Sequence, residues 1–330
     1  MTSKERVNNI LEGKPVDRKP VVPLIMTYSA KLYGVPYSKY CRDYKTLVSA
    51  DMKTYELLRY DMLSPISDAF REAYDFGENV VFPYDGVPYC KDFLIKEYSY
   101  IKKIKVVEPL SSERMLDRIK AVELFRKEIG DDVPILGWIE GAFAEACDVR
   151  GVENVMMDTI DNPEFLFELL DVIVEVETKF AIEQIKAGAE SIGIGESVGS
   201  LVSEKTYRKF ALPCMKKMID IIHEFKAKVR LHICGDITHL LGLIGELNVD
   251  IVDLDWMVSI KRAREILGSD VCVAGNFDPV SVLLKGTPED IRRCVEEEGN
   301  DAGQKHMICP GCEVPPDTPM ENMLAFCPGA

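Results

Sequence analysis

The chain has 330 residues, of which 47% are hydrophobic and 29% are charged, and its formal net charge is −15. This composition is typical of a globular protein with a large core, and the negative charge excludes the basic face that a nucleic-acid-binding protein needs. No apolar run reaches the roughly 18 residues of a membrane span, so no membrane partner is expected. Ten cysteines without an apolar leader segment predict reduced thiols in a cytoplasmic protein.

Strand-like and helix-like segments alternate along the chain. The capping box Thr2-x-x-Glu5 opens a short N-terminal helical extension that ends at Gly13. Eight runs rich in β-branched residues follow, separated by stretches with helical spacing: 21–26, 61–66, 135–140, 191–196, 229–234, 251–256, 271–276 and 305–309. This order predicts a single (β/α)8 barrel domain, a TIM barrel, over residues 1–330.

One segment interrupts this alternation. Residues 83–110 contain many tyrosines and a strand-like run at 104–107, and we expect them to form an inserted hairpin or lid. A doubly wound open sheet is the alternative architecture. It is disfavoured because no Gly-rich phosphate loop follows the first strand-like run.

The predicted strands end in polar residues and metal-ligand types. These are Glu140, Glu196, His232, Cys234, Asp253, Asp255, Asn276, Cys309 and Cys312. Because a barrel brings the carboxyl ends of its strands to one mouth, where catalytic residues lie, this set predicts an active site. Glu140 and Glu196 are candidates to orient a substrate or to donate a proton.

A metal site is indicated by the pair His232-x-Cys234. The two side chains lie on one side of a strand, because the strand period is two. The further candidates, Cys309 and Cys312, end the eighth run. One imidazole and two thiolates suit zinc, and three protein ligands leave an open, catalytic position. The alternative is a turn with buried thiols.

The segment "GDITHLLG" (235–242) is close to the D-x-H-x-x-G motif that ligates cobalt in corrinoid-binding domains. Its spacing differs by one residue, and the run looks like the helix after the fifth strand. We therefore expect that this chain does not carry a corrinoid itself.

At these residues the chain resembles the uroporphyrinogen decarboxylase superfamily, and within it the zinc-dependent cobamide methyltransferases. The resemblance rests on the segments "SKERVNNILEGKPVDRKPV" (3–21), "IEGAFAEACDVRG" (139–151), "AGAESIGIGES" (187–197), "LHICGD" (231–236), "VAGNFDP" (273–279) and "CPGCEVPPDTPMEN" (309–322). It implies a (β/α)8 barrel that binds Zn²⁺ through His232, Cys234 and Cys312, and a corrinoid supplied by a partner protein.

The chain departs from the decarboxylases at residues 26–43, "MTYSAKLYGVPYSKYCRD", whose only arginine is Arg42. A porphyrinogen with eight carboxylates needs a cationic cleft, so decarboxylation of that substrate is disfavoured. The segment also differs from the "TQTGT" stretch associated with coenzyme M methyltransferases. None of the predicted strand ends carries an arginine that could bind a sulfonate.

The favoured function is that of a demethylating component, which transfers a methyl group from a small methylated substrate, a methoxylated aromatic, to the Co(I) corrinoid of a separate protein. Tyr33, Tyr37 and Asn276 are the expected substrate-binding residues. The alternatives are a methylcobamide:thiol methyltransferase, a uroporphyrinogen decarboxylase-like decarboxylase, and a non-catalytic zinc-binding barrel. A homodimer is left open.

Overall fold

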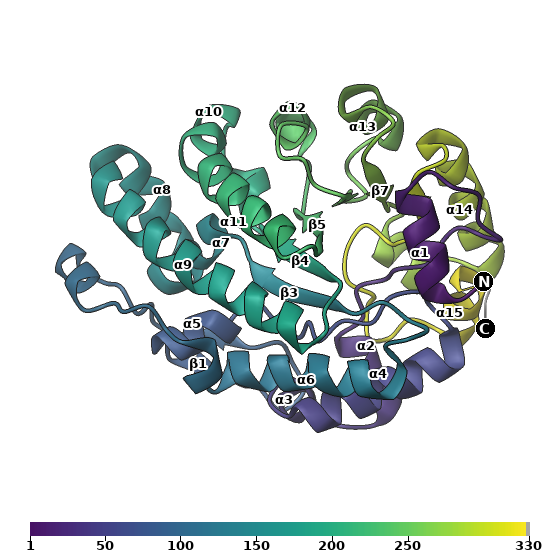
Figure 1. Ribbon diagram of the computed structural model, residues 1–330, viewed down its shortest axis with the longest axis horizontal. Coiled ribbons are helices and arrows are strands. Elements are labelled where there is room, and N and C mark those ends of the chain that lie inside the picture. Colours follow the sequence, from purple (N-terminus) through teal and green to yellow (C-terminus); the bar gives the residue numbers. More distant parts are fainter. Residues whose placement is uncertain (328–330) are drawn as a thin grey trace.

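The computed structural model describes residues 1–327. Over these residues six parallel strands form one sheet, in the spatial order of the chain, with helices outside it (Figure 1). The strands are β3 Leu136–Glu140, β4 Ser191–Gly195, β5 Lys228–His232, β6 Ile251–Asp253, β7 Cys272–Ala274 and β8 His306–Met307. Each strand pairs in parallel with the next along the chain, as helical crossovers require.

The sheet closes through the segments predicted to be the first two strands. Val21 forms a parallel bridge with Ile308, and Leu63 forms one with Ile135. The backbone N–H of Asp61 donates to the carbonyl of Val21 at 2.6 Å and joins the two segments. The (β/α)8 barrel is therefore confirmed, but runs 21–26 and 61–66 form isolated bridges rather than full strands. A proline two residues after each bridge, at 23 and 65, removes a ladder donor.

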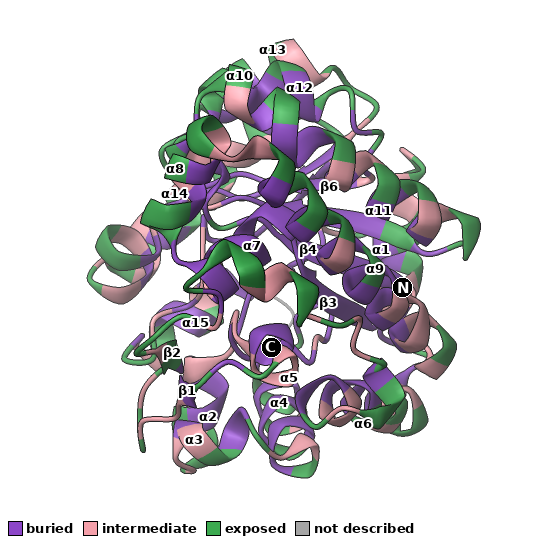
Figure 2. Cartoon of the chain, turned by 90° about the vertical axis from the view of Figure 1, so that its left-hand side faces the viewer, coloured by how far each residue is buried: buried purple, intermediate pink, exposed green. Residues whose placement is uncertain are grey.

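Side chains alternate between the inside of the barrel and the helical layer. One buried cluster lies inside the barrel and contains Leu136, Trp138, Ile251, Cys272, Met307 and Cys309. The alternate residues of the same strands, such as Ile139, Ile192 and Leu231, belong to the larger cluster against the helices. In Figure 2 the strands are accordingly buried and the helices expose only their outer faces.

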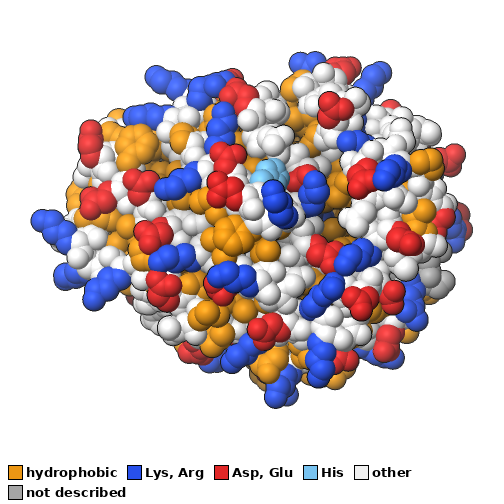
Figure 3. All heavy atoms as spheres, in the orientation of Figure 1, with side chains coloured by type: hydrophobic (Ala, Val, Ile, Leu, Met, Phe, Trp, Pro, Cys, Tyr) orange, Lys and Arg blue, Asp and Glu red, His pale blue; other side chains and the backbone are white. Residues whose placement is uncertain are grey.

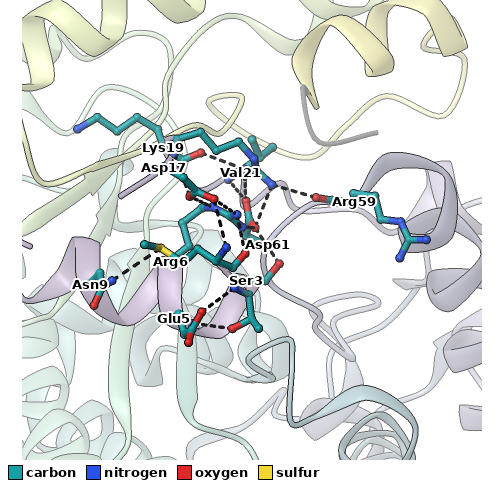
Figure 4. A network of polar contacts seen from close by, with 12 residues as sticks. Ser3, Glu5, Arg6, Asn9, Asp17, Lys19, Val21, Arg59 and Asp61 are labelled. Atoms are coloured by element: carbon teal, nitrogen blue, oxygen red, sulfur yellow. Dashed lines mark hydrogen bonds and ion pairs between the residues drawn. The ribbon is translucent and has the colours of Figure 1, made fainter. Parts of the chain in front are cut away.

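The amino end of the barrel is held by a buried carboxylate (Figure 4). Asp61 is fully buried and accepts hydrogen bonds from Ser3 Oγ at 2.8 Å, Arg6 Nη1 at 2.6 Å, Arg18 Nη1 at 2.5 Å and the backbone N–H of Val21 at 2.8 Å. We call these five residues the Asp61 hub. It connects the N-terminal helix to both bridge segments.

The helices surround the strands, and several begin at the expected caps. They are α1 Ser3–Leu11, α2 Thr27–Tyr33, α3 Tyr37–Tyr40, α4 Tyr44–Leu58, α5 Arg71–Phe76, α6 Arg114–Ile129, α7 Ala142–Arg150, α8 Val152–Asp161, α9 Pro163–Ala187, α10 Glu204–Thr206, α11 Leu212–Glu224, α12 Leu241–Ile244, α13 Ile260–Leu267, α14 Pro288–Ala302 and α15 Met320–Phe326. The capping box of Thr2 and Glu5 opens α1, as predicted. None of the helices in residues 1–327 is both long and apolar enough to cross a bilayer.

A short hairpin forms at the inserted segment, but its first strand lies before the predicted range 83–110. Strands β1 Val80–Val81 and β2 Tyr89–Cys90 pair antiparallel, and a short 3-10 helix follows at Tyr98–Lys102. The run at 104–107 is irregular rather than a strand. Its three apolar residues pack only partly against the core. The run pairs with no strand within residues 1–327, so its high β-propensity is not realised.

Acidic and basic side chains are interspersed on the face shown in Figure 3. The excess negative charge of the chain therefore does not gather into one patch on this face.

Candidate metal centre at the barrel mouth

Two strand ends bring one histidine and two cysteines together. His232 ends β5, Cys234 follows two residues later, and Cys312 lies in the loop after β8. His232 Nε2 is 3.2 Å from Cys234 Sγ and 3.9 Å from Cys312 Sγ, and the two sulfur atoms are 3.9 Å apart. All three candidate ligand atoms thus lie within 4.8 Å of one another. We call this group the mouth triad.

The backbone around the triad depends on glycine. Gly235, directly after Cys234, has a φ of 87°, which a side chain would oppose, and its N–H donates to Asp255 Oδ2 at 2.9 Å. Gly311, directly before Cys312, lies so close to the backbone of Trp256 that a Cβ atom would collide with it. Both cysteine loops therefore pack against the segment Asp255–Trp256.

The orientation of the His232 ring is fixed by Asp253 on the neighbouring strand β6. Its Nδ1 is 3.3 Å from Asp253 Oδ2, so Nδ1–H donates to that carboxylate and Nε2 is left for the triad. Arg230, fully buried inside the barrel, donates from Nε to Asp253 at 2.8 Å and from Nη2 to the carbonyl of Val22 at 2.9 Å. This guanidinium lowers the pKa of Asp253, although burial opposes it.

Cys309 has a separate place. Its sulfur lies 3.5 Å from Arg230 Nη2 inside the barrel, and it is not among the atoms that converge with His232. Strand alternation explains this position, because Cys309 shares its inward direction with Met307. The geometry therefore groups Cys312, and not Cys309, with His232 and Cys234.

The electrostatics of the triad favour a thiolate. A hydrogen bond from Cys234, together with the neighbouring His232, lowers the pKa of Cys312 to about 4, against burial. Donation of that hydrogen bond raises the pKa of Cys234. A cation in place of the shared proton would stabilise both thiolates. Two sulfur atoms and an imidazole held in the correct tautomer fit zinc, and the fourth position is left open.

Glu140 lies on the same layer of the barrel as His232. Strand register aligns Glu140 with Gly195 and Gly195 with His232, so two strand spacings, about 10 Å, separate the two backbones. Gly195 has no side chain, and Glu140 Oε2 lies 2.8 Å from the place of its missing Cβ. The carboxyl group therefore extends over β4 toward the triad.

Arg71 holds the other oxygen of Glu140, at 2.8 Å from its Nη2. The guanidinium is fully buried, and its Nε and Nη1 have no hydrogen-bond partner among the described residues. Burial and the nearby Glu72 raise the pKa of Glu140 well above its usual value, although Arg71 opposes the rise. Sequence reasoning missed Arg71, because it lies five residues after the predicted strand 61–66.

Trp138 was also missed. It points into the barrel two residues before Glu140, and its ring centroid is 6.3 Å from that of His232. Gly193 makes room for its ring, because a Cβ there would collide with it. The glycines in "SIGIG" (191–195), at alternate positions of β4, were the available signal of a large neighbour on this face.

Glu196 lies elsewhere. Strand alternation places it with Ile194 on the helical side of β4, and its carboxylate lies against Gly141 at the start of α7. Neither oxygen has a hydrogen-bond partner among the described residues. Burial raises the pKa of Glu196 to about 8, and the N–H groups of the first turn of α7 oppose the rise only in part. A catalytic role for Glu196 stays a prediction without support from contacts with the triad.

The expected substrate-binding residues do not converge. Tyr37 is buried, donates its hydroxyl to the carbonyl of Ser67 and stacks on Tyr40 with ring centroids 5.4 Å apart. Tyr33 is 43% exposed at the end of α2. The amide of Asn276 donates to the carbonyls of Asp255 and Val258 and thereby holds loop backbone near the mouth.

Comparison with known proteins agrees with this architecture. The family model described as "Uroporphyrinogen decarboxylase (URO-D)" matches residues 2–328. The chain belongs to the uroporphyrinogen decarboxylase family.

Relatives within the family carry two different activities in their names. The chain is 26% identical over 328 residues to the methylcobamide:CoM methyltransferase MtbA of Methanosarcina acetivorans. The aligned region covers 98% of this chain and 95% of the relative. It is 25% identical over 329 residues to the uroporphyrinogen decarboxylase of Geotalea daltonii, with 94% of each covered. A solved methyltransferase from Methanosarcina mazei shares the fold, with a TM-score of 0.90, 23% identity, and coverage of 99% of this chain and 97% of that one.

Proposed function

We propose that the mouth triad binds one zinc ion, and that the protein transfers a methyl group between a small substrate and the corrinoid of a separate protein. The convergence of His232 Nε2 with the sulfur atoms of Cys234 and Cys312 is the observation that carries this proposal. Zinc in such a site acts as a Lewis acid on an ether oxygen or a thiol. The methyltransferase names of the relatives support the same chemistry.

We propose demethylation as the direction of transfer. A Co(I) corrinoid takes the methyl group as the O–CH₃ bond breaks, and the departing alkoxide or phenolate needs a proton. Glu140 is suited to supply it, because burial raises the pKa of this carboxyl group above its usual value and the group extends over β4 toward His232. A methoxylated aromatic is the proposed donor, although the pair of tyrosines expected to flank it does not form, because Tyr37 lies in the core.

Methyl transfer to a thiol is the second candidate. The name of the relative MtbA favours it, and so does Arg71. The lack of an arginine at the predicted strand ends was one reason to set this candidate aside, together with the missing "TQTGT" stretch. The buried guanidinium of Arg71, however, reaches Glu140 and has two nitrogen atoms without a partner among residues 1–327. An anionic thiol substrate could use these donors.

Two assays and a metal measurement test the proposal. The purified protein should contain about one zinc per chain, and Cys312→Ser should lose it, whereas Cys309→Ser should keep it. Mixed with a Co(I) corrinoid protein and methoxylated phenols, the zinc protein should produce free phenol as the Co(I) absorption band disappears. Thiol methylation from methylcobalamin without ether cleavage would reverse the direction of transfer. Full zinc in Cys312→Ser would refute the site.

A further inference from the structure

A second group of ligand-type residues lies behind the end of β3. Glu72 of α5, Glu145 of α7 and Glu177 of α9 each offer a carboxylate oxygen within 4.8 Å of the other two. All three residues are fully buried, and α7 packs against both α5 and α9 (Figure 1). We call these residues the glutamate cluster.

Most of the carboxylate oxygens in the cluster lack a partner. Both oxygens of Glu145, both of Glu177 and Oε2 of Glu72 accept no hydrogen bond from any described residue. Oε1 of Glu72 is 3.4 Å from Arg71 Nη2. Buried polar groups nearly always have partners, and a buried carboxylate without one costs several kcal/mol. These oxygens therefore require a ligand or protons.

The surrounding charge is strongly unbalanced. Glu140 and Asp148 lie close enough to raise the pKa of Glu145, and Arg71 is the cation that forms ion pairs with this region within residues 1–327. Burial raises the pKa of Glu145 well above its usual value, and burial together with Glu72 and Glu140 does the same for Glu177. One guanidinium thus opposes several carboxyl groups, and a bound divalent cation would reduce the imbalance.

We propose that Glu72, Glu145 and Glu177 bind a hard divalent cation of the Mg²⁺, Mn²⁺ or Ca²⁺ class. Carboxylate oxygens are the ligands these ions prefer, and metal–oxygen distances of about 2.0–2.6 Å place the ligand atoms within roughly 5 Å of one another. The all-oxygen set differs from the nitrogen and sulfur atoms of the mouth triad. The two sites should therefore select different metals.

The ion would connect three helices and act on the mouth indirectly. It would tie α5 to α7 and α9, and it would leave Arg71, the neighbour of Glu72, to hold Glu140. The glutamate cluster is thus a positioning site for the Arg71–Glu140 pair. It does not depend on zinc binding or on the direction of methyl transfer.

Manganese is the probe that tests the site. Zinc-loaded full-length protein is titrated with Mn²⁺, and free Mn²⁺ is followed by electron paramagnetic resonance. We expect one Mn²⁺ per chain, displaced by Ca²⁺ or Mg²⁺, and a rise in the melting temperature. Glu145→Gln and Glu177→Gln should each lower the Mn²⁺ affinity at least tenfold and leave the zinc content unchanged. Glu175→Gln, on the same helix but exposed and paired with Lys179, is the matched control.

Each other result counts against the site. No Mn²⁺ binding at millimolar concentration, or binding that is equally strong in both Gln variants, would overturn it. If a Gln variant does not fold, Glu177→Asp keeps the charge, shortens the side chain and must still weaken Mn²⁺ binding. Cys312→Ser should lose zinc and retain Mn²⁺, so a failure of the zinc proposal can be distinguished from a failure of this one.

Discussion

The buried carboxylate of Asp61 and the buried glutamate cluster differ in how their oxygen atoms are satisfied. At the amino end, both oxygens of Asp61 accept hydrogen bonds, from two arginines, a serine and a backbone N–H. Behind the carboxyl end of β3, the oxygens of Glu145 and Glu177 accept none within residues 1–327. The first group is complete without a ligand, whereas the second is not.

This difference matches the division of labour known for barrels, in which the amino end contributes stability and the carboxyl end contributes chemistry. The Asp61 hub replaces ladder hydrogen bonds that the short bridge segments cannot form. The mouth instead contains polar atoms without partners among residues 1–327, including Nε and Nη1 of Arg71, and these are satisfied only when a ligand binds. We therefore expect substitutions at the mouth to change activity and metal content, and substitutions at the hub to change stability.

The largest expected effect is at the mouth triad. His232→Ala should remove zinc and lower methyl transfer at least a thousandfold, because the loss of several kcal/mol of Lewis-acid stabilisation corresponds to about that factor. The melting temperature should change little, since the core is large and the triad contributes little to it. Metal analysis, the phenol-release assay and circular dichroism measure the three quantities. A collapse of the fold would instead indicate a structural zinc.

The converse test is at the Asp61 hub. Asp61→Ala should lower the free energy of unfolding by about 3–5 kcal/mol, because it leaves Arg6 without its buried counter-charge. Zinc content at low temperature should remain at the wild-type level. Urea unfolding measures the loss, and Asp17→Asn, which removes a half-exposed partner of the same arginine, should cost far less. Equal losses in the two variants would contradict the special role of the hub.

A smaller effect is expected behind His232. Asp253→Asn should weaken zinc affinity roughly 10- to 100-fold, because the amide cannot stabilise Nδ1–H as a carboxylate does. Competition with a chromogenic chelator measures the affinity. The chain offers a matched control in Asp250→Asn, since Asp250 makes a similar 2.9 Å contact to His223 away from the triad. Similar zinc affinities in both variants would mean that Asp253 does not position His232.

The smallest expected effect concerns a lone carboxylate without a partner. The pKa of Glu196 is raised to about 8 in the folded chain, from an ordinary value of 4.5. The stability that its protonated form contributes is therefore fully present below pH 4.5 and is lost as the pH rises from 4.5 to about 8. Glu196→Gln should remove the dependence and gain about 1–3 kcal/mol relative to the wild type between pH 5 and 9. Urea unfolding across this range checks it, and parallel curves for both proteins would refute it.

Local patterns in the sequence were sufficient to predict the barrel and to pair His232 with Cys234, but they left both Cys309 and Cys312 as candidates for the third ligand. A strand period of two placed His232 and Cys234 on one side, and the alternation of strands with helices brought the ends of β5 and β8 to one mouth. Both inferences depend on residues close in sequence or on the order of elements, which a linear pattern records. The prolines at 23 and 65 are also visible in the sequence. They explain why the first two predicted strands form only isolated bridges.

Only the tertiary structure decided which polar residues meet. Arg71 reaches Glu140 across 69 positions, Asp253 fixes His232 from a neighbouring strand, and the glutamate cluster is assembled from three helices. Tyr37, an aromatic residue expected to bind substrate, lies in the core. Glu196 ends a predicted strand as Glu140 does, but its side chain points to the helical side. The sequence determines which side of its own element a residue occupies. Contacts between elements depend on side-chain packing and on which distant segments lie next to each other in space. A repeating pattern within one element does not encode either.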